Sequence, residues 1–474
     1  MSDPSRDAAL RSELGSLLGA DAVLSDPDVT APLLIDHHRR YHGRALSVVQ
    51  PQSLQQVESL VRWCNERRIG LVPQAGNTGY CGAATPDASG RQVLLLLRRM
   101  NRIRAIDAAN FSMIAEAGCV LQHVQQAAIA ADRYFPLSLG AEGSCQLGGN
   151  LGTNAGGLNV VRYGMTRELV LGIEAVLGDG RVLHGLKSLR KDNTGYDLKS
   201  LLIGSEGTLG VITAASLKLW PQPRSHATAF LGIRTPGDAI ALLGHLRATG
   251  GERLSSFELL PRIAVEVAAR HIPEVSDPLP VPYPWYVLCE LSSAADEPLG
   301  DLLQRVLAEA AERSLLADAV LATSERVRAA FWRLREHVPE AQRLDGASIK
   351  HDIGVPMASL AQFIGEAGDW VAEHVPEARL FSYGHAGDGN LHFNLHCAGN
   401  PAERSAFLAR APHIRRAIHD LVARYHGSIS AEHGIGQLKR EELVRYADPT
   451  ALAAMRAIKQ ALDPNGIMNP GKLL

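Results

Sequence analysis

The 474-residue sequence lacks several features that would assign it to a familiar class of protein. Its 48 Lys and Arg residues are balanced by 50 Asp and Glu residues, so it has no basic excess of the kind that binds nucleic acid or an anionic membrane. No apolar run reaches the ~18 to 20 residues that a membrane-spanning helix needs. The longest runs, such as Val93 to Leu97, have the length of a strand. We therefore expect neither nucleic-acid binding nor a membrane span.

The first twenty residues also lack the pattern of a targeting signal. Asp3, Asp7 and Glu13 lie among their polar residues. A secretory signal needs a basic start and an unbroken apolar core, and a mitochondrial presequence avoids acidic residues. We therefore expect a cytoplasmic protein.

The six cysteines are scattered, and no CxxC pair occurs among them. This pattern argues against a zinc knot and against a thioredoxin-like site. Free cysteines are usually buried and, in the cytoplasm, reduced. We therefore expect six reduced and mostly buried thiols.

The chain shows no internal repeat, low-complexity tract or charge block. An amphipathic helix is expected near 7–18 and another over 53–68, followed by a strand that begins at Gly70. Pro221 and Pro223 give the strongest boundary signal, because prolines stop a strand and stiffen a linker. These patterns predict an α+β protein with a helical arm over 1–38, a first domain over 39–222 and a second over 223–474, whose last residues return to the first.

Three glycine-rich segments lie before Pro221, over 73–79, 140–157 and 204–210. Glycine lets backbone N–H groups approach phosphate oxygens closely, so such loops can hold a pyrophosphate. One loop of this kind is usually a plain turn, but three in one domain favour a nucleotide site. The GxGxxG motif of a Rossmann domain and the P-loop motif are both absent.

The order and composition of these loops resemble the FAD domain (PCMH type) of the vanillyl-alcohol-oxidase-type flavoproteins, and within them the FAD-linked D-2-hydroxy-acid dehydrogenases. The resemblance covers roughly 36–474 and implies a two-domain flavoprotein with an FAD domain and an α+β substrate, or cap, domain that also holds a metal. Ala75 stands where the family more often has glycine. The residues that the resemblance assigns to FAD are Pro73, Gln74, Ala75, Gly76, Asn77, Thr78, Gly79, Gly140, Gly143, Ser144, Gly148, Gly149, Asn150, Gly152, Thr153, Asn154, Gly156, Gly157, Glu206, Gly207, Gly210, Val211, Ile212 and, in the tail, Asn469.

The resemblance also bears on how FAD is held. Some relatives bind flavin covalently through a histidine in the first loop, and that position is Asn77 here. An amide has no nucleophilic ring nitrogen. Cys145 in the second loop is the alternative attachment point, and small packing residues are common there. We expect FAD to be bound without a covalent link.

A second signal is the sequence Gly-His-Ala-Gly-Asp-Gly-Asn-Leu-His-Phe-Asn over 384–394, followed by Glu-His-Gly-Ile-Gly over 432–436. Two histidines and a glutamate can form a three-ligand site for a catalytic Zn²⁺. A hydrogen-bonded histidine cluster in a polar loop explains the same residues equally well. If 391–397 is a strand, then His392, Asn394 and His396 share one face of it.

These two motifs resemble the metal-binding motifs of D-2-hydroxyglutarate dehydrogenases and their close relatives. The resemblance implies that His385, His392 and Glu432 bind a divalent metal, most simply Zn²⁺. It implies that Asn394 and His433 face the substrate, with His433 as the catalytic proton acceptor. Asp388 and Asn390 are expected to shape the turn, and His396 is expected to be structural.

Cationic anchors for a hydroxy acid are suggested in the same way. Arg335 and Lys350 lie in segments that resemble the substrate segments of the family, and arginine and lysine both suit a carboxylate. Relatives specialised for hydroxyglutarate often have threonine at the position of Pro339, and proline cannot supply that hydroxyl. If the metal and one of these two cations bind the α-carboxylate of the substrate, the other cation has no counter-charge. Such a cation favours a substrate with a second carboxylate.

The predicted function is FAD-dependent, metal-assisted oxidation of a small D-2-hydroxy acid, with D-2-hydroxyglutarate favoured. Flavin N5 would take the hydride and a neutral histidine the hydroxyl proton. A D-lactate or glycolate dehydrogenase of the same family is the main alternative, and a zinc hydrolase a remote one. The electron acceptor is expected to be an electron-transfer flavoprotein or a quinone-like carrier, and a homodimer is left open.

Overall fold

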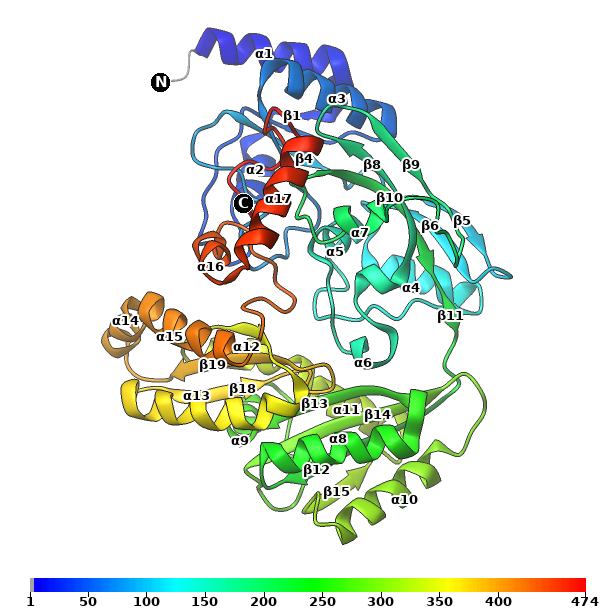
Figure 1. Ribbon diagram of the computed structural model, residues 1–474, viewed down its shortest axis with the longest axis vertical. Helices are drawn as coiled ribbons and strands as arrows, with labels where there is room; N and C mark the ends of the chain where they lie inside the picture. Colours follow the sequence, from blue (N-terminus) through cyan, green and yellow to red (C-terminus); the bar gives the residue numbers. More distant parts are fainter. Residues whose placement is uncertain (1–3) are drawn as a thin grey trace. The chain divides into compact units, whose positions relative to one another are not determined.

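The computed structural model describes residues 4–474 and divides into two compact units, each built from sheets and helices (Figure 1). Unit 1 comprises Met1–Gly156, Met165–Gln222 and Glu432–Leu474. Unit 2 comprises Gly157–Gly164 and Pro223–Ala431. Both mix helices with mainly antiparallel sheets, so the predicted α+β class is confirmed. Within 4–474, no helix combines the length and the apolar character that a membrane crossing requires.

One division between the units lies after Gln222, beside Pro221 and Pro223, and two segments belong to the unit other than that of the residues next to them in the chain. Residues 157–164 belong to unit 2, where Arg162 donates from Nη1 to the Ser292 carbonyl oxygen and Oγ, both at 2.7 Å. Residues 432–474 belong to unit 1. Their end pairs with a strand of that unit: Leu71 N donates to Ile467 O and Asn469 N to Leu71 O, both at 2.8 Å. Long-range pairing of this kind leaves no local signal in the sequence.

Unit 1 is built from three sheets, one of which is the two-stranded pair of β7 and β11, and the helices around them. Its helices are α1 (Pro4–Leu18), α2 (Pro27–Thr30), α3 (Leu54–Arg67), α4 (Leu121–Ala130), α5 (Leu147–Thr153), α7 (Leu198–Leu202), α16 (Arg440–Tyr446) and α17 (Pro449–Leu462). Its strands are β1 (Val23–Leu24), β2 (Ser47–Val49), β3 (Gly70–Gln74), β4 (Gln92–Leu96), β5 (Ile103–Asp107), β6 (Ser112–Glu116), β7 (Arg133–Tyr134), β8 (Val170–Leu177), β9 (Val182–Gly185), β10 (Gly210–Lys218) and β11 (Trp220–Pro221).

The first sheet of unit 1 has the order β1-β2-β4-β3, with β2, β4 and β3 parallel. Helix α3 provides the crossover from β2 to β3. Ser53 caps it, since Ser53 Oγ accepts from Gln56 N at 3.3 Å, and it ends at Arg68 in the left-handed conformation. Its buried face includes Val57, Leu60 and Cys64 at helical spacing, as the sequence predicts. Helix α1 packs on the same core through Leu14 and Leu18.

The largest sheet of unit 1 is antiparallel, with the order β5-β6-β10-β8-β9. A buried carboxylate, Glu116 on β6, is hydrogen-bonded by Arg102, which directly precedes β5, and by Arg104 on β5. Arg104 also reaches Glu174 on β8 at 3.0 Å. These pairs cross-link one face of the sheet, whereas β10 is buried along nearly its whole length.

Unit 2 contains two further antiparallel sheets. Its helices are α6 (Val160–Tyr163), α8 (Pro236–Gly250), α9 (Arg262–His271), α10 (Leu299–Glu312), α11 (Glu325–Glu336), α12 (Val338–Asp345), α13 (Leu360–His374), α14 (Pro401–Ala409) and α15 (Ala411–Arg424). Its strands are β12 (Ser225–Ile233), β13 (Leu254–Pro261), β14 (Trp285–Ser293), β15 (Asp318–Leu321), β16 (Ala347–Ile349), β17 (Asp352–Gly354), β18 (Arg379–Tyr383) and β19 (Asn390–Cys397). The first sheet has the order β13-β14-β12-β15. In the second, β16, β17 and β18 all pair with β19.

Strand β19 organises the second sheet of unit 2. β16 and β17 follow one register along it, because Ser348 pairs with His396 and Asp352 with His392. Leu391, Phe393 and Leu395 are fully buried on one face. His392, Asn394 and His396 alternate with them, so the predicted alternation over 391–397 is confirmed. Helix α12 covers this polar face: Gln342 contacts Asn394 and Asp345 contacts His396.

Candidate functional site

A hollow in unit 1 brings together residues from all three glycine-rich loops. Its volume is about 580 Å³, part of which is open to solvent. The predicted residues that line it are Pro73, Gln74, Ala75, Gly148, Gly149, Gly152, Thr153, Glu206, Gly207, Gly210, Val211 and Ile212. Ala83, Ala84, Leu97 and Ser205 also line it and were not predicted. A concave hollow lined by glycine-rich loops suits a nucleotide cofactor, because glycine lets backbone N–H groups approach phosphate oxygens closely.

Two glycines show why the loops can converge. A Cβ on Gly76 would lie 2.4 Å from the Ser144 carbonyl oxygen, so the first loop packs directly on the second. A Cβ on Gly148 would lie 2.9 Å from the Ala117 side chain. Both distances are shorter than real Cβ contacts, so any side chain there would push the loops apart.

Two buried amide oxygens at this site have no hydrogen-bond partner among residues 4–474: Gln74 Oε1 and Asn469 Oδ1. The amide nitrogens of the same two side chains, in contrast, do donate hydrogen bonds. Gln74 Nε2 donates to Leu33 O and Ala84 O, and Asn469 Nδ2 donates to Ala83 O and Glu206 O. A buried polar atom without a partner is costly, and a ligand that supplies a donor removes that cost. The residues present therefore fit a bound polar cofactor.

The two candidate attachment points for a covalent flavin have other roles. Asn77 adopts a left-handed conformation, with φ of 52°, and its Nδ2 donates to Ile35 O at 2.9 Å. Cys145 is buried, and burial raises the pKa of its thiol. A thiol with a raised pKa is a poor nucleophile. All six cysteines are buried and unpaired, as predicted.

The other predicted FAD residues do not line the hollow itself, but one of them, Asn469, donates hydrogen bonds to Ala83 and Glu206, which do. These other residues are Gly76, Asn77, Thr78, Gly79, Gly140, Gly143, Ser144, Asn150, Asn154, Gly156, Gly157 and Asn469. Asn154 ends α5 in the left-handed conformation, and its Oδ1 accepts from Arg167 N at 2.8 Å. Gly157 is assigned to unit 2.

Glu206, in the third loop, holds the segment that carries the Glu-His-Gly-Ile-Gly motif. Its buried carboxylate accepts from Ile435 N at 2.7 Å and from Gly436 N at 2.8 Å. Burial raises the pKa of Glu206, although these two N–H groups act in the opposite direction. Gly434 has a positive φ, and a Cβ there would lie 2.7 Å from Glu206 Oε1. Glu206 is therefore a positioning residue for the predicted base His433.

Tyr80, which the sequence analysis did not identify, supports His433 more directly. The two rings are stacked, with centroids 4.2 Å apart and planes 3° apart. Tyr80 also contacts His38 edge-on at 4.5 Å. All these residues belong to unit 1. The stacking restricts the orientation of the His433 ring.

Two of the three predicted metal ligands, His385 and His392, lie together in unit 2, with ring centroids 5.6 Å apart. His385 Nδ1 lies 2.7 Å from Glu258 Oε1. Burial raises the pKa of Glu258, but Arg335 and His385 outweigh it and bring that pKa to about 2. The carboxylate is therefore the acceptor and Nδ1–H the donor, which leaves the lone pair of a neutral His385 on Nε2. This carboxylate–histidine arrangement is typical of metal-ligating histidines.

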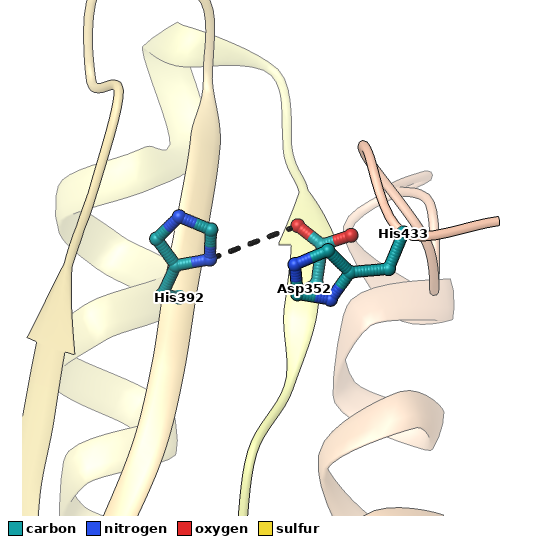
Figure 2. A group of neighbouring side chains, drawn as sticks. All are labelled: Asp352, His392 and His433. Carbon is teal, nitrogen blue, oxygen red and sulfur yellow. Dashed lines mark ion pairs between the residues drawn. The ribbon is translucent and has the colours of Figure 1, made fainter. Parts of the chain in front are cut away.

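Glu432 is the first residue of the last unit 1 segment, directly after Ala431 of unit 2. Within unit 2, Asp352 forms an ion pair with His392, with 3.9 Å between Oδ1 and Nδ1 (Figure 2). Asp352 also accepts from Asn390 Nδ2 at 3.0 Å. Asp352 was not predicted, although it lies two residues after the predicted Lys350.

Arg335 differs from the expectation in one respect. The prediction of a second substrate carboxylate assumed a buried cation without a counter-charge, but Arg335 Nε donates to Glu258 Oε2 at 2.7 Å. Both side chains are buried. The sequence could not reveal this pair, because 77 residues separate its members. For Arg335, the counter-charge argument is therefore wrong.

Lys350 falls in the gap between β16 and β17. The shared register on β19 places it opposite Asn394. Asn394 is buried, its Oδ1 accepts from His351 N at 3.2 Å, and its Nδ2 donates to Gln342 Oε1 at 3.0 Å. His396 is fully buried between Asp345 and Ser348, as expected of a structural residue.

Comparison with known families matches nearly the whole chain. A model described as "FAD binding domain" matches residues 45–185, and one described as "FAD linked oxidases, C-terminal domain" matches residues 222–473. The chain is 39% identical over 457 residues to bovine mitochondrial D-2-hydroxyglutarate dehydrogenase, covering 95% of this chain and 81% of that protein. It is 35% identical over 469 residues to D-2-hydroxyglutarate dehydrogenase of Stutzerimonas stutzeri, covering 98% and 99%.

Solved structures agree on the fold. p-Cresol methylhydroxylase superposes with a TM-score of 0.77 at 16% identity, covering 99% of this chain and 97% of that one. A 4-ethylphenol oxidase from Gulosibacter chungangensis gives 0.75 at 18% identity, with the same coverage. At such identities the likeness shows the vanillyl-alcohol-oxidase-type fold alone. Together with the sequence relatives, it identifies the chain as a member of the D-2-hydroxyglutarate dehydrogenase family of FAD-linked oxidases, flavoenzymes that act on a CH–OH group.

Proposed function

We propose that this flavoenzyme oxidises D-2-hydroxyglutarate to the 2-oxo acid. The observation that carries the proposal is the similarity to a bacterial enzyme of that name over 98% of this chain and 99% of the relative. A match that spans both units covers the FAD loops and the predicted substrate residues together.

FAD is bound without a covalent link in this proposal. The first loop offers Asn77 where a nucleophile would be needed, and its amide is engaged with Ile35 O. Cys145 is a buried thiol whose pKa is raised. When bound, FAD supplies the N5 atom that accepts a hydride from C2 of the substrate.

A divalent metal, most simply Zn²⁺, is held by His385, His392 and Glu432. The support from this structure is the donor set: Glu258 fixes the tautomer of His385, and Asp352 lies beside His392. An ion held there would supply a Lewis acid to oxygen atoms of the substrate. Two histidines and a carboxylate are a ligand set that Zn²⁺ accepts with coordination positions left for substrate.

The remaining roles fall to four side chains. His433 accepts the hydroxyl proton, and stacking on Tyr80 holds its ring in one orientation. Arg335 and Lys350 attract the substrate carboxylates, and Asn394 donates to the substrate from the polar face of β19. A neutral imidazole has a pKa near that required of a base at pH 7.

D-Lactate is the second candidate substrate. Glycolate, which lacks the methyl group of lactate, belongs to the same alternative. Two observations favour keeping it: Arg335 already has a counter-charge in Glu258, and Pro339 cannot donate a hydroxyl hydrogen bond. Neither observation excludes a second carboxylate beside Lys350.

Three further features belong to the proposal. The acceptor is an electron-transfer flavoprotein or a quinone-like carrier, and oxygen is a poor substitute. The compartment is the cytoplasm in this proposal, whereas several relatives are named mitochondrial. A homodimer is left open.

The test compares kcat/KM for D-2-hydroxyglutarate and D-lactate, with an artificial electron acceptor, in wild type and in Lys350→Ala. If Lys350 binds the distal carboxylate, the variant loses about 30- to 1,000-fold on hydroxyglutarate and much less on lactate. Equal losses on both acids would show that Lys350 holds the shared α-carboxylate. No turnover of D-2-hydroxyglutarate by wild type, with rapid turnover of D-lactate, would replace the proposed substrate.

A further inference from the structure

Gln342 on α12 has a buried hydrogen-bond donor for which residues 4–474 provide no acceptor. Its side chain is fully buried, with 0% exposure. Its Oε1 accepts from Asn394 Nδ2 at 3.0 Å, whereas its Nε2 has no hydrogen-bond partner in the described chain. A buried N–H group without an acceptor costs about 1 to 3 kcal/mol, so it calls for an explanation.

The orientation of the Gln342 amide is fixed by its neighbours. His351 N is a backbone donor, so the Asn394 atom that it contacts must be the carbonyl oxygen Oδ1. The other end of the Asn394 amide is therefore Nδ2, a donor, and it must meet an acceptor on Gln342. Reversing either amide would place two donors or two acceptors together. Gln342 Nε2 is therefore the buried donor that has no acceptor in the described chain.

Gln342, on α12, contacts the polar face of β19 through Asn394, which lies two strand positions from the predicted metal ligand His392. Asn394, its hydrogen-bond partner, is two residues beyond His392 in β19, and Lys350 lies opposite Asn394 in register. Two residues of strand span about 6.6 Å. Three C–C bonds and one C–O bond place the distal carboxylate oxygens of extended hydroxyglutarate about 5 Å from C2. The two lengths are comparable, whereas lactate ends at a methyl group next to C2.

Gln342 also lies one helical turn after Pro339 on α12. Residues three apart on a helix share a face, so the two positions address the same side of the sheet. The amide of Gln342 supplies a donor on the same face.

We propose that Gln342 is a specificity-determining residue whose Nε2 donates a hydrogen bond to the distal carboxylate of the substrate. The inference rests on the proposed function, because it requires a dicarboxylate at this face. Lys350 supplies the charge and Gln342 the directed donor, while Asn394 keeps the amide oriented.

The test uses Gln342→Met, which keeps the length of the side chain but has no amide. Gln342→Glu is the second variant, measured at pH 8, because it retains an acceptor for Asn394 and replaces the donor with an oxygen. Gln362→Met, an exposed position on α13, is the matched control. Bound flavin and melting temperature establish that each variant is folded.

For D-2-hydroxyglutarate we expect KM to rise about 10- to 150-fold in both Gln342 variants, the value of a hydrogen bond to a charged group, with kcat within about threefold of wild type. For D-lactate, kcat/KM should change at least tenfold less. The control should match wild type. A hydroxyglutarate KM within threefold of wild type in Gln342→Met, or equal losses on both acids, would overturn the assignment. The wild-type measurement separates the proposed substrate from the role of Gln342. If wild type does not turn over hydroxyglutarate, the proposed function is wrong, and the role of Gln342 is then wrong as well. If wild type turns it over and the Gln342 variants match wild type, only the role of Gln342 is wrong.

Discussion

Replacing Glu258 with glutamine tests the link between the predicted metal ligand His385 and the predicted substrate anchor Arg335. Glu258 has an exposed side-chain fraction of 1% and accepts from both partners at 2.7 Å. Glutamine has nearly the same shape but no charge. Its NH₂ group must also face one of two donors, Arg335 Nε or His385 Nδ1. The variant therefore leaves a buried guanidinium without a counter-charge and breaks one of the two hydrogen bonds.

Two separate estimates give the loss of folding stability in Glu258→Gln. Removing one partner of a buried ion pair costs about 3 to 5 kcal/mol. Arg335 and His385, acting against desolvation, bring the pKa of Glu258 from its ordinary 4.5 to about 2. At about 1.4 kcal/mol per pKa unit, that difference corresponds to about 3 kcal/mol of stability. Both estimates are compatible with a loss of about 3 kcal/mol of folding stability.

The direction in which stability changes with pH follows from the lowered pKa of Glu258. The stabilisation by the Glu258 carboxylate is complete above its unfolded value of 4.5 and is lost as pH falls through the folded value of about 2. The contribution of the Glu258 carboxylate to the stability gap between wild type and Glu258→Gln should therefore be largest above pH 4.5. That gap should narrow below pH 4.5.

The assay is differential scanning calorimetry on protein freed of metal by chelation. For a unit of about 200 residues, 3 kcal/mol corresponds to a lowering of Tm by about 6 to 12 °C. Metal affinity, measured by competition with a chelating dye, should fall about 10- to 100-fold, because the residue that orients His385 is altered.

Glu297→Gln is the control, since Glu297 binds Arg253 at the same 2.7 Å but with both side chains partly exposed. It should lower Tm much less than Glu258→Gln does, because solvent screens an exposed ion pair, and it should leave metal affinity unchanged. Unchanged Tm and unchanged metal affinity in Glu258→Gln would refute the reasoning.

Three further predictions concern the cofactor, the metal and the base. Acid precipitation should release FAD into the supernatant, because neither Asn77 nor Cys145 offers a nucleophile; a yellow pellet would contradict this. Chelation, or His385→Ala, should lower turnover at least ~100-fold while the flavin stays bound, and full activity in a preparation shown to be metal-free by elemental analysis would disprove the metal assignment. Tyr80→Leu should lower kcat about 2- to 10-fold by removing the stacking on His433, whereas Tyr80→Phe should retain it; equal kcat in both variants would count against that role.

The elements that the sequence predicts are those with a local pattern. Ser53 caps α3, and apolar residues at helical spacing define its buried face. The alternation over β19 likewise separates the polar residues from Leu391, Phe393 and Leu395. The three glycine-rich loops also carry their signal locally, and residues from each of them line one hollow.

The residues that the sequence analysis missed share a different property: each acts through a partner far along the chain. Glu258 lies 127 residues before His385, and Tyr80 lies 353 residues before His433. A lone glutamate in an apolar strand or a lone tyrosine after a loop has no periodicity or spacing that identifies its partner. Gln342 is similar, because its significance comes only from the orientation that His351 and Asn394 impose.

The most direct test of the central claim is anaerobic titration of the purified holoenzyme with D-2-hydroxyglutarate while the visible flavin band is recorded. One equivalent per bound FAD should bleach that band and yield one equivalent of the 2-oxo acid, and the L-enantiomer should leave the band unchanged. A flavin that stays oxidised in excess D-2-hydroxyglutarate, in protein shown to contain both FAD and metal, would contradict the account.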